Sequence, residues 1–262
     1  MRALSTAATG MAAQELNVEV ISNNIANMNT VGFKRQRAEF QDLLYQDQEQ
    51  VGSQSDSTGT VVPTGLQVGS GVKAGSIYRI TQQGSMTQTS NPLDVAIQGA
   101  GYLQVQLPSG ETAYTRAGNL SVNNSGVLVT DQGYPILPQI TIPTGATNIT
   151  ISQSGLVSAT VPGSSTPSNL GQLQLASFIN EAGLEGLGDN LWQVSGASGA
   201  AVVAQPGQNG LGTLLQGYTE ASNVDAVSEV TALISAQRAY EMNSKVITTA
   251  DQMLATSVQE KS

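Results

Sequence analysis

A seven-residue repeat of apolar residues at both ends of the chain constrains its fold more than any other feature of the sequence. Near the N-terminus the repeat comprises Leu4, Met11, Val18 and Ile25, with Ala7, Ile21 and Met28 at most of the alternate positions. Near the C-terminus apolar pairs recur at the same interval: Ala232-Leu233, Ala239-Tyr240, Val246-Ile247 and Met253-Leu254. Such a repeat is typical of a helix that packs along another helix. We therefore expect the two ends to pair with each other and with copies of themselves.

The two repeats predict long helices over residues 3–28 and 224–258. The asparagine-rich stretch from Asn23, followed by Gly32, indicates where the first helix ends. Ser222 or Asn223 is expected to cap the second helix, with Asp225 favourable in its first turn. The second helix contains neither Pro nor Gly, and its roughly 35 residues far exceed the mean of about 11–12 for globular proteins. This length favours a coiled coil or bundle over a single surface helix.

The middle of the chain has the pattern of a β-domain. Short alternating runs suited to strands occupy residues 94–97, 102–107, 126–129, 140–142, 148–161 and 173–179. Residues 108–111 and 123–126 are rich in Pro, Gly, Asn and Ser, as expected of the tight turns between strands. The spacing of these runs is typical of a sandwich or barrel-like domain.

The expected fold class is α+β, with a mostly-β central domain flanked by helices that pair into a bundle. We expect an N-terminal helix (1–33), an extended insert (34–66), a β-rich outer domain (67–222) and a C-terminal helix (223–262). The insert places Phe40, Leu43 and Leu44 at helix-compatible spacing. Residues 46–60 are rich in Gln, Ser, Gly and Asp, which indicates either a disordered linker or an arm ordered only against neighbours.

Composition excludes several classes of function. With 10 basic and 19 acidic residues the net charge is -9, which disfavours nucleic acid or an anionic membrane as partner. The chain has no Cys and no His, so disulfides, thiolate nucleophiles, Cys/His metal sites and Ser-His triads are impossible. We expect no catalytic, cofactor-binding or metal site and no small-molecule substrate. A carboxylate-based hydrolase using Asp94 and Glu111 stays an alternative.

Two segments with basic residues, one beginning at Arg2 and one at Lys34, bear on secretion and on the choice of partner. Polar residues interrupt the sequence after Arg2, so we expect no secretory signal there; if the protein works outside the cytoplasm, it leaves by a route without a cleaved signal peptide. The basic cluster Lys34, Arg35 and Arg37 suits a solvated or inter-subunit salt-bridging face better than a nucleic-acid patch.

Three sets of motifs resemble the bacterial flagellar rod and hook axial protein family. The N-terminal signature is NNIANMNTVGFK at residues 23–34. The central β-domain is represented by DVAIQGAGY at 94–102, YTRAG at 114–118 and GVLVT at 126–130. The C-terminal signature is GYTEASNVD at 217–225, followed by QRAYEMNSK at 237–245. These motifs occur in the family's order, so the resemblance covers most of the chain.

Length and the insert after Phe33 resemble the distal-rod members of this family most closely, with a proximal rod or hook paralogue as the alternative. A secreted β-rich binding module oligomerised by its helices is the alternative of another class. The resemblance implies a structural, non-enzymatic subunit that polymerises into a tubular drive shaft and transmits torque from motor to hook. It also implies that the terminal helices line the tube, that the insert braces neighbouring subunits, and that the subunit lies in the periplasm-spanning basal body.

The partners implied by the resemblance are all components of the flagellum. They are copies of the same chain, proximal rod proteins, the hook or hook–rod junction, the bushing rings of the peptidoglycan and outer membrane, the type III export apparatus and the rod cap. The heptads and family motifs together predict an assembly interface made of Leu4, Met11, Val18, Ile25, Asn24, Asn27, Thr30, Gly32, Phe33, Phe40, Leu43, Leu44, Leu233, Gln237, Arg238, Tyr240, Asn243, Ile247 and Leu254.

Overall fold

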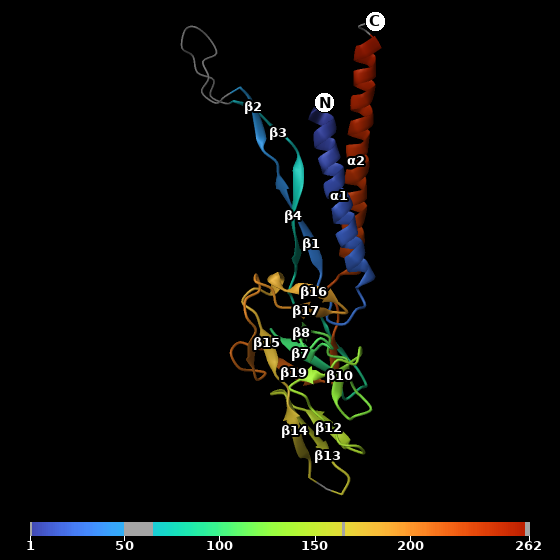
Figure 1. Ribbon diagram of the computed structural model, residues 1–262. Helices are drawn as coiled ribbons and strands as arrows, with labels where there is room; N and C mark the ends of the chain where they lie inside the picture. Colours follow the sequence, from blue (N-terminus) through green and yellow to red (C-terminus); the bar gives the residue numbers. More distant parts are fainter. Residues whose placement is uncertain (1, 50–64, 164–165, 260–262) are drawn as a thin grey trace. The chain divides into compact units, whose positions relative to one another are not determined.

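The computed structural model describes residues 2–49, 65–163 and 166–259 (Figure 1). The chain divides into two compact units. We call Met1–Ile25, Gln36–Tyr78 and Asp225–Ser262 the helical unit, and Ala26–Arg35 with Arg79–Val224 the β unit. Helices at both ends with a strand-rich middle confirm the expected α+β class. No helix among the described residues is long and apolar enough to cross a membrane.

Two helices dominate the helical unit. Helix α1 spans Arg2–Ala26 and α2 spans Ala226–Gln259, so both long helices predicted from the heptads are present. They lie side by side and antiparallel, blue and red in Figure 1. Asp225 caps α2, since its Oδ1 accepts a hydrogen bond from the N–H of Ser228 at 2.8 Å. The prediction that Ser222 or Asn223 is the cap was therefore wrong.

The described residues of the insert form strands. Its first part gives β1 (Gln36–Asp42) and β2 (Tyr45–Glu49), which pair with β4 (Val72–Arg79) and β3 (Leu66–Gly69), respectively. The helix-compatible spacing of Phe40, Leu43 and Leu44 was misleading. The backbone hydrogen bonds of this segment go across to another strand: the N–H of Leu43 donates to Gly71 O at 2.9 Å. Residues 50–60 of the Gln- and Ser-rich stretch lie outside the described residues.

The β unit contains the remaining strands. They are β5 (Met86–Gln88), β6 (Val95–Gln98), β7 (Tyr102–Gln106), β8 (Thr112–Thr115), β9 (Leu120–Val122), β10 (Leu128–Thr130), β11 (Ile136–Leu137), β12 (Thr147–Ile151), β13 (Leu156–Thr160), β14 (Ser168–Gln172), β15 (Leu175–Ser177), β16 (Glu185–Gly188), β17 (Leu191–Gln193), β18 (Val202–Ala204), β19 (Thr213–Gln216) and β20 (Tyr218–Glu220), with a 3-10 turn at Glu181–Gly183.

The largest sheet of this unit has the order β16-β17-β8-β7-β15-β18, with β11 also paired to β7. Strands β12, β13 and β14 form a second sheet, and β6–β19, β5–β20 and β9–β10 form two-stranded ribbons. Both predicted turns are present, closed by Gly110 N–H to Leu107 O and by Gly126 N–H to Asn123 O, each at 2.9 Å. Residues 140–142 form only an isolated bridge, between Thr141 and Val127.

The core of the β unit is fully shielded from solvent. Apolar side chains from most of its strands meet in one cluster that includes Val95, Leu103, Val105, Leu128, Ile136, Leu173 and Leu175. The strands that carry the central family motifs contribute several of these residues. This core holds the loops between the strands in fixed positions, including those that surround the charged residues described below.

Candidate assembly site

The two helices contact each other where Gly10 of α1 faces Asn243 of α2. Ala7 and Ala13 of α1 and Ala236 of α2 are buried. A Cβ built on Gly10 would come 2.8 Å from Asn243 Nδ2, so this glycine leaves room for the Asn243 side chain. A helical glycine costs about 1 kcal/mol relative to alanine, and the contact with Asn243 explains why one occurs in α1.

Asn24 joins three segments of the helical unit. Its Nδ2 donates to Glu229 Oε2 of α2 at 3.1 Å and to Gln36 O of β1 at 2.8 Å. Its Oδ1 accepts from the Gln36 N–H at 2.9 Å. The side chain is 1 % exposed, and both its Nδ2 and its Oδ1 form hydrogen bonds within the chain. Asn24 thus fixes the start of β1 against both helices and is not a surface contact.

The rest of the predicted interface is incompletely covered in the single chain. Leu4, Met11, Val18, Ile25, Leu233, Asn243 and Ile247 are half-buried, as are Asn27, Thr30, Phe33, Phe40 and Leu43. Gln237, Arg238, Tyr240, Leu254 and Leu44 are exposed, Leu44 to 86 %. Gly32 is buried, and its role lies in the β unit. Participation of these residues in assembly stays a prediction.

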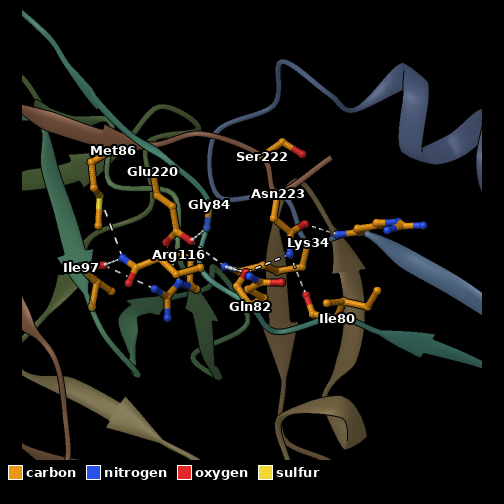
Figure 2. Close-up of polar contacts among 12 residues, drawn as sticks. Lys34, Ile80, Gln82, Gly84, Met86, Ile97, Arg116, Glu220, Ser222 and Asn223 are labelled. Carbon is orange, nitrogen blue, oxygen red and sulfur yellow. Dashed lines mark hydrogen bonds and ion pairs between the residues drawn. The ribbon is translucent and has the colours of Figure 1, made fainter. Parts of the chain in front are cut away.

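In the β unit, motifs from three distant parts of the sequence converge on one buried carboxylate (Figure 2). Lys34 Nζ lies 2.5 Å from Glu220 Oε1, and Arg116 Nε lies 2.8 Å from Glu220 Oε2. The Gly84 N–H also donates to Oε1, at 3.0 Å. We call Lys34, Arg116 and Glu220 the charge cluster. Their side chains are only 2 %, 4 % and 1 % exposed, respectively.

Backbone carbonyls satisfy the remaining donors of the two cations. Arg116 donates to Gly101 O at 3.0 Å and to Gly99 O at 2.9 Å, and Lys34 donates to Gln82 O at 3.0 Å. Gly99 and Gly101 have positive φ angles of 112° and 130°, and this conformation turns their carbonyls toward the guanidinium. A buried ion pair needs such additional hydrogen bonds to offset desolvation.

Burial and charge act in opposite directions on Glu220. Burial alone would raise the pKa of this carboxyl, but Arg116, Lys34 and the Gly84 N–H lower it further than burial raises it. The net pKa lies below the ordinary glutamate value. The pKa of Lys34 is also lowered, by burial and by Arg116, against the opposing effect of Glu220. Glu220 is therefore ionised at neutral pH and compensates two cations.

Gly32 and Asn223 attach the flanking segments to this cluster. The N–H of Gly32 donates to Glu220 O at 2.8 Å. Gly32 has a φ of 70°, and an added Cβ would lie 2.9 Å from backbone atoms of Arg116 and Ala117. Asn223 Oδ1 accepts from the Arg35 N–H at 2.7 Å, while its Nδ2 donates to Ile80 O at 3.0 Å and Gln82 O at 2.8 Å (Figure 2). The stretches 32–35 and 220–223 thus lie together.

Comparisons with known proteins account for the same motifs. Three family models match: "Flagella basal body rod protein" over residues 4–34, "Flagellar hook protein FlgE/F/G D1 domain" over 96–159, and "Flagellar basal body rod FlgEFG protein C-terminal" over 215–260. The flagellar basal-body rod protein FlgG of Caulobacter vibrioides is 69% identical over 262 residues, covering 100% of both chains. The chain belongs to the flagellar basal-body rod protein family.

Two more distant rod proteins cover nearly the whole chain as well. The FlgG proteins of Agrobacterium fabrum and Borreliella burgdorferi are 53% and 46% identical, with 97% of this chain aligned in each case. The protein is thus a structural component of the bacterial flagellar basal body. The resemblance read from the N-terminal, central and C-terminal motifs is confirmed.

The rod-family signatures contain buried charged residues that sequence reasoning did not single out. Arg116 and Glu220 lie inside the quoted motifs YTRAG and GYTEASNVD but were given no role. Lys34 was assigned to a basic face with Arg35 and Arg37, and this was wrong for Lys34. Its side chain is buried against Glu220, whereas Arg37 pairs with exposed Glu39.

The carboxylates considered for hydrolase chemistry have ordinary partners. Asp94 Oδ1 accepts from Asn91 Nδ2 at 2.8 Å, which closes a turn. Glu111 Oε2 accepts from Gln193 Nε2 at 3.2 Å on the exposed surface. Each contact is typical of a turn or a strand edge, and nothing in these geometries favours the hydrolase alternative.

Proposed function

We propose that this rod protein is the distal-rod subunit, which polymerises through α1 and α2 into the tubular shaft that passes torque from motor to hook. The observation that carries the proposal is the mismatch within α2, which pairs with α1 yet leaves large apolar side chains in solvent. Val227, Met242, Met253 and Val258 are 78 %, 63 %, 68 % and 69 % exposed. A monomer rarely exposes so much apolar surface along one element. We expect further copies of the chain to cover these side chains.

The pairing of α1 with α2 accounts for only part of the heptad pattern. Glu229 contacts α1 through Asn24, whereas Val227, Val230 and Ile234 lie elsewhere around α2 and are 78 %, 45 % and 46 % exposed. A helix that is apolar on two sides needs neighbours on both. In the proposed tube, α1 covers one side and helices of adjacent subunits cover the other.

The strands of the insert are proposed to brace neighbouring subunits. Leu44, Tyr45, Leu66 and Ile77 are 86 %, 57 %, 51 % and 50 % exposed on the narrow ribbons β1–β4 and β2–β3. Two-stranded ribbons are marginally stable by themselves. Contacts with adjacent subunits along the ribbons would cover these side chains and stiffen the shaft.

The proposal includes the remaining features implied by the family. The subunit acts mechanically, without catalysis or cofactor, and recognises neither nucleic acid nor a small-molecule substrate. It contacts proximal rod proteins, the hook or hook–rod junction, the peptidoglycan and outer-membrane rings, and the export apparatus and rod cap. It lies in the part of the basal body that spans the periplasm.

Replacing one apolar residue of α2 by a charge tests the proposal. Leu233→Asp or Ile247→Asp should abolish rod assembly and swimming in a strain that lacks the wild-type chain, because a carboxylate would be buried between helices. The matched replacements Leu233→Met and Ile247→Val keep the surface apolar and should assemble. Electron microscopy of isolated basal bodies provides the measurement. Normal rods from both aspartate variants would refute the proposed role of the helices.

A further inference from the structure

The helical unit carries an open groove with an apolar floor and an acidic rim. Val18 and Tyr240 line it together with Glu15, Glu19, Glu241 and Gln237, and its volume is about 670 Å³. Tyr240 is 44 % exposed, and the three carboxylates are exposed. We call these six residues the acidic groove. Its apolar part suits a buried contact, and its rim favours a partner that brings positive charge.

A second surface on α2 has the opposite sign. Met242, Lys245, Val246 and Thr249 line a shallow apolar depression, in which Met242 and Val246 are 63 % and 48 % exposed. Arg238 precedes Met242 by four residues and is also exposed, so it lies on the same side of the helix. We call Arg238, Met242, Lys245, Val246 and Thr249 the basic flank. It carries two cations and no carboxylate.

The two surfaces meet at Glu241, which lies three positions after Arg238 and four before Lys245, but their centres face different directions around the helix. Tyr240 and Val246 are six positions apart, which corresponds to about 120° around the axis at 3.6 residues per turn. One copy can therefore use its acidic groove and its basic flank at the same time, toward two different neighbours. A contact between two unlike surfaces is heterologous, and repeated heterologous contacts generate closed rings or helical arrays.

We propose that the acidic groove of one copy receives the basic flank of a second copy. This inference rests on the proposed polymerisation and names the surfaces that contact each other in it. The contact places Lys245 and Arg238 of one copy beside the three glutamates of the next, and Met242 and Val246 against Tyr240 and Val18. Methionine sulfur packs favourably on aromatic rings, and complementary charges fix the register of an interface and reject wrong partners.

The alternative contacts between copies are electrostatically unfavourable. Groove against groove would bring six carboxylates together, and flank against flank would bring together four cations; like charges in an interface are strongly disfavoured. Among the described residues, none of the five charged side chains of the two surfaces forms an ion pair within the chain. These charges are thus available to a second copy.

Charge reversal tests the pairing in cells that lack the wild-type chain. Glu15→Lys with Glu19→Lys makes both surfaces basic, and Arg238→Glu with Lys245→Glu makes both acidic. Each variant alone should lose rods and swimming, because like charges would then meet at every contact. Coexpression of the two variants should restore rods built from alternating copies, as should one chain that carries all four replacements. All the residues are exposed, so circular dichroism should show unchanged folding.

Cysteine cross-linking tests the geometry. The chain has no native Cys, so introduced thiols give no background. Cells that carry the Tyr240→Cys and Val246→Cys chains together should, after mild oxidation of isolated basal bodies, yield the mixed dimer at roughly tenfold or more over either same-site dimer, because a disulfide requires Cα atoms within about 7 Å.

The outcomes separate this inference from the proposed function. Normal rods from each reversal variant alone would overturn the pairing of these surfaces. So would rods that fail to form on coexpression, predominant same-site dimers, or cross-links to a different protein. In all these cases a rod-minus deletion strain, complemented by the unaltered chain, would still support the proposed function. If the deletion strain retained a complete distal rod, the proposed function itself would fail.

Discussion

The β unit and the helical unit differ in how completely they bury their apolar side chains. In the β unit Leu103, Val105 and Leu128 are completely buried, and even its central charges are enclosed. In the helical unit α2 carries Val227 and Met253 at 78 % and 68 % exposure. The β unit therefore completes its core within one chain, whereas the helical unit leaves large apolar side chains of α2 exposed in the single chain. Four predictions test this difference.

The largest effect is expected from Glu220→Gln. The amide cannot neutralise Lys34 and Arg116, which would remain buried at 2 % and 4 % exposure. Removing one partner of a buried ion pair costs about 3–5 kcal/mol. Urea unfolding followed by fluorescence of Trp192, the only Trp of the chain and a residue of the β unit, measures this loss. The matched control Glu111→Gln alters an exposed contact and should change stability by under about 0.5 kcal/mol.

A loss below about 1 kcal/mol for Glu220→Gln would contradict the role given to the charge cluster, since surface substitutions reach only about 0.5 kcal/mol. It would mean that the β unit tolerates two buried cations without their counter-charge. The contrast between an enclosed β unit and an incomplete helical unit would then rest on apolar burial alone.

A smaller loss is expected from Gly32→Ala. A Cβ at φ of 70° would stand 2.9 Å from Ala117 N and Arg116 C, which adds a steric clash to the strain of about 1–3 kcal/mol for such a conformation. Gly110→Ala is the matched control, because Gly110 also has a positive φ, of 88°, but nothing within 4 Å of the added atom. The same Trp192 unfolding experiment compares them. Equal losses would show that the close approach at Gly32 is unimportant.

Acid should remove only part of the stability that Glu220→Gln removes, because the lowered pKa of Glu220 makes its carboxylate resist protonation in the folded chain. The pKa of Glu220 is lowered in the folded chain. Its stabilising contribution is therefore present above the unfolded value of about 4.3 and is lost as pH falls through the folded value. The difference between the urea midpoints of the wild type and Glu220→Gln should be smaller at pH 3 than at pH 7. A gap that stays constant between these pH values would disprove the linkage.

The smallest effect on the β unit is expected from Leu233→Asp. This residue belongs to the helical unit, and the β unit buries its own core, so the Trp192 unfolding midpoint should correspond to a change of under about 0.5 kcal/mol. The same variant is expected to abolish rods. A loss of several kcal/mol in the β unit would show that the two units do not complete their cores independently.

Sequence reasoning was most successful where one period persists over many residues. The heptads predicted α1 and α2 to within a few residues of their ends, and alternation together with turn residues located β6, β7 and β10. It failed where a segment pairs with a distant one. The strands β1 and β2 form because β4 and β3, which begin at Val72 and Leu66, supply the backbone hydrogen bonds, while Phe40 and Leu43 considered locally suggest a helix.

The charge cluster was unpredictable for a similar reason. Lys34, Arg116 and Glu220 occur in separate motifs, and a single sequence does not indicate which charges meet. The cap of α2 was missed because the Asn223 carboxamide is used by Ile80, Gln82 and Arg35. Asp225 then supplies the cap. The exposed interface residues stay predictions, because a single chain does not contain the neighbours that would cover them.

The position of Glu220 in the chain also affects how fast the β unit can fold. Its contacts with Lys34 and Arg116 span 186 and 104 residues. Closing such long loops costs conformational entropy before any contact forms, and topologies dominated by distant contacts fold slowly. When the chain emerges N-terminus first, Glu220 becomes available for these contacts only after most of the chain has emerged. Late formation of these contacts would keep the polypeptide unfolded during the proposed export. The β unit would then fold only after nearly the whole chain has been exported.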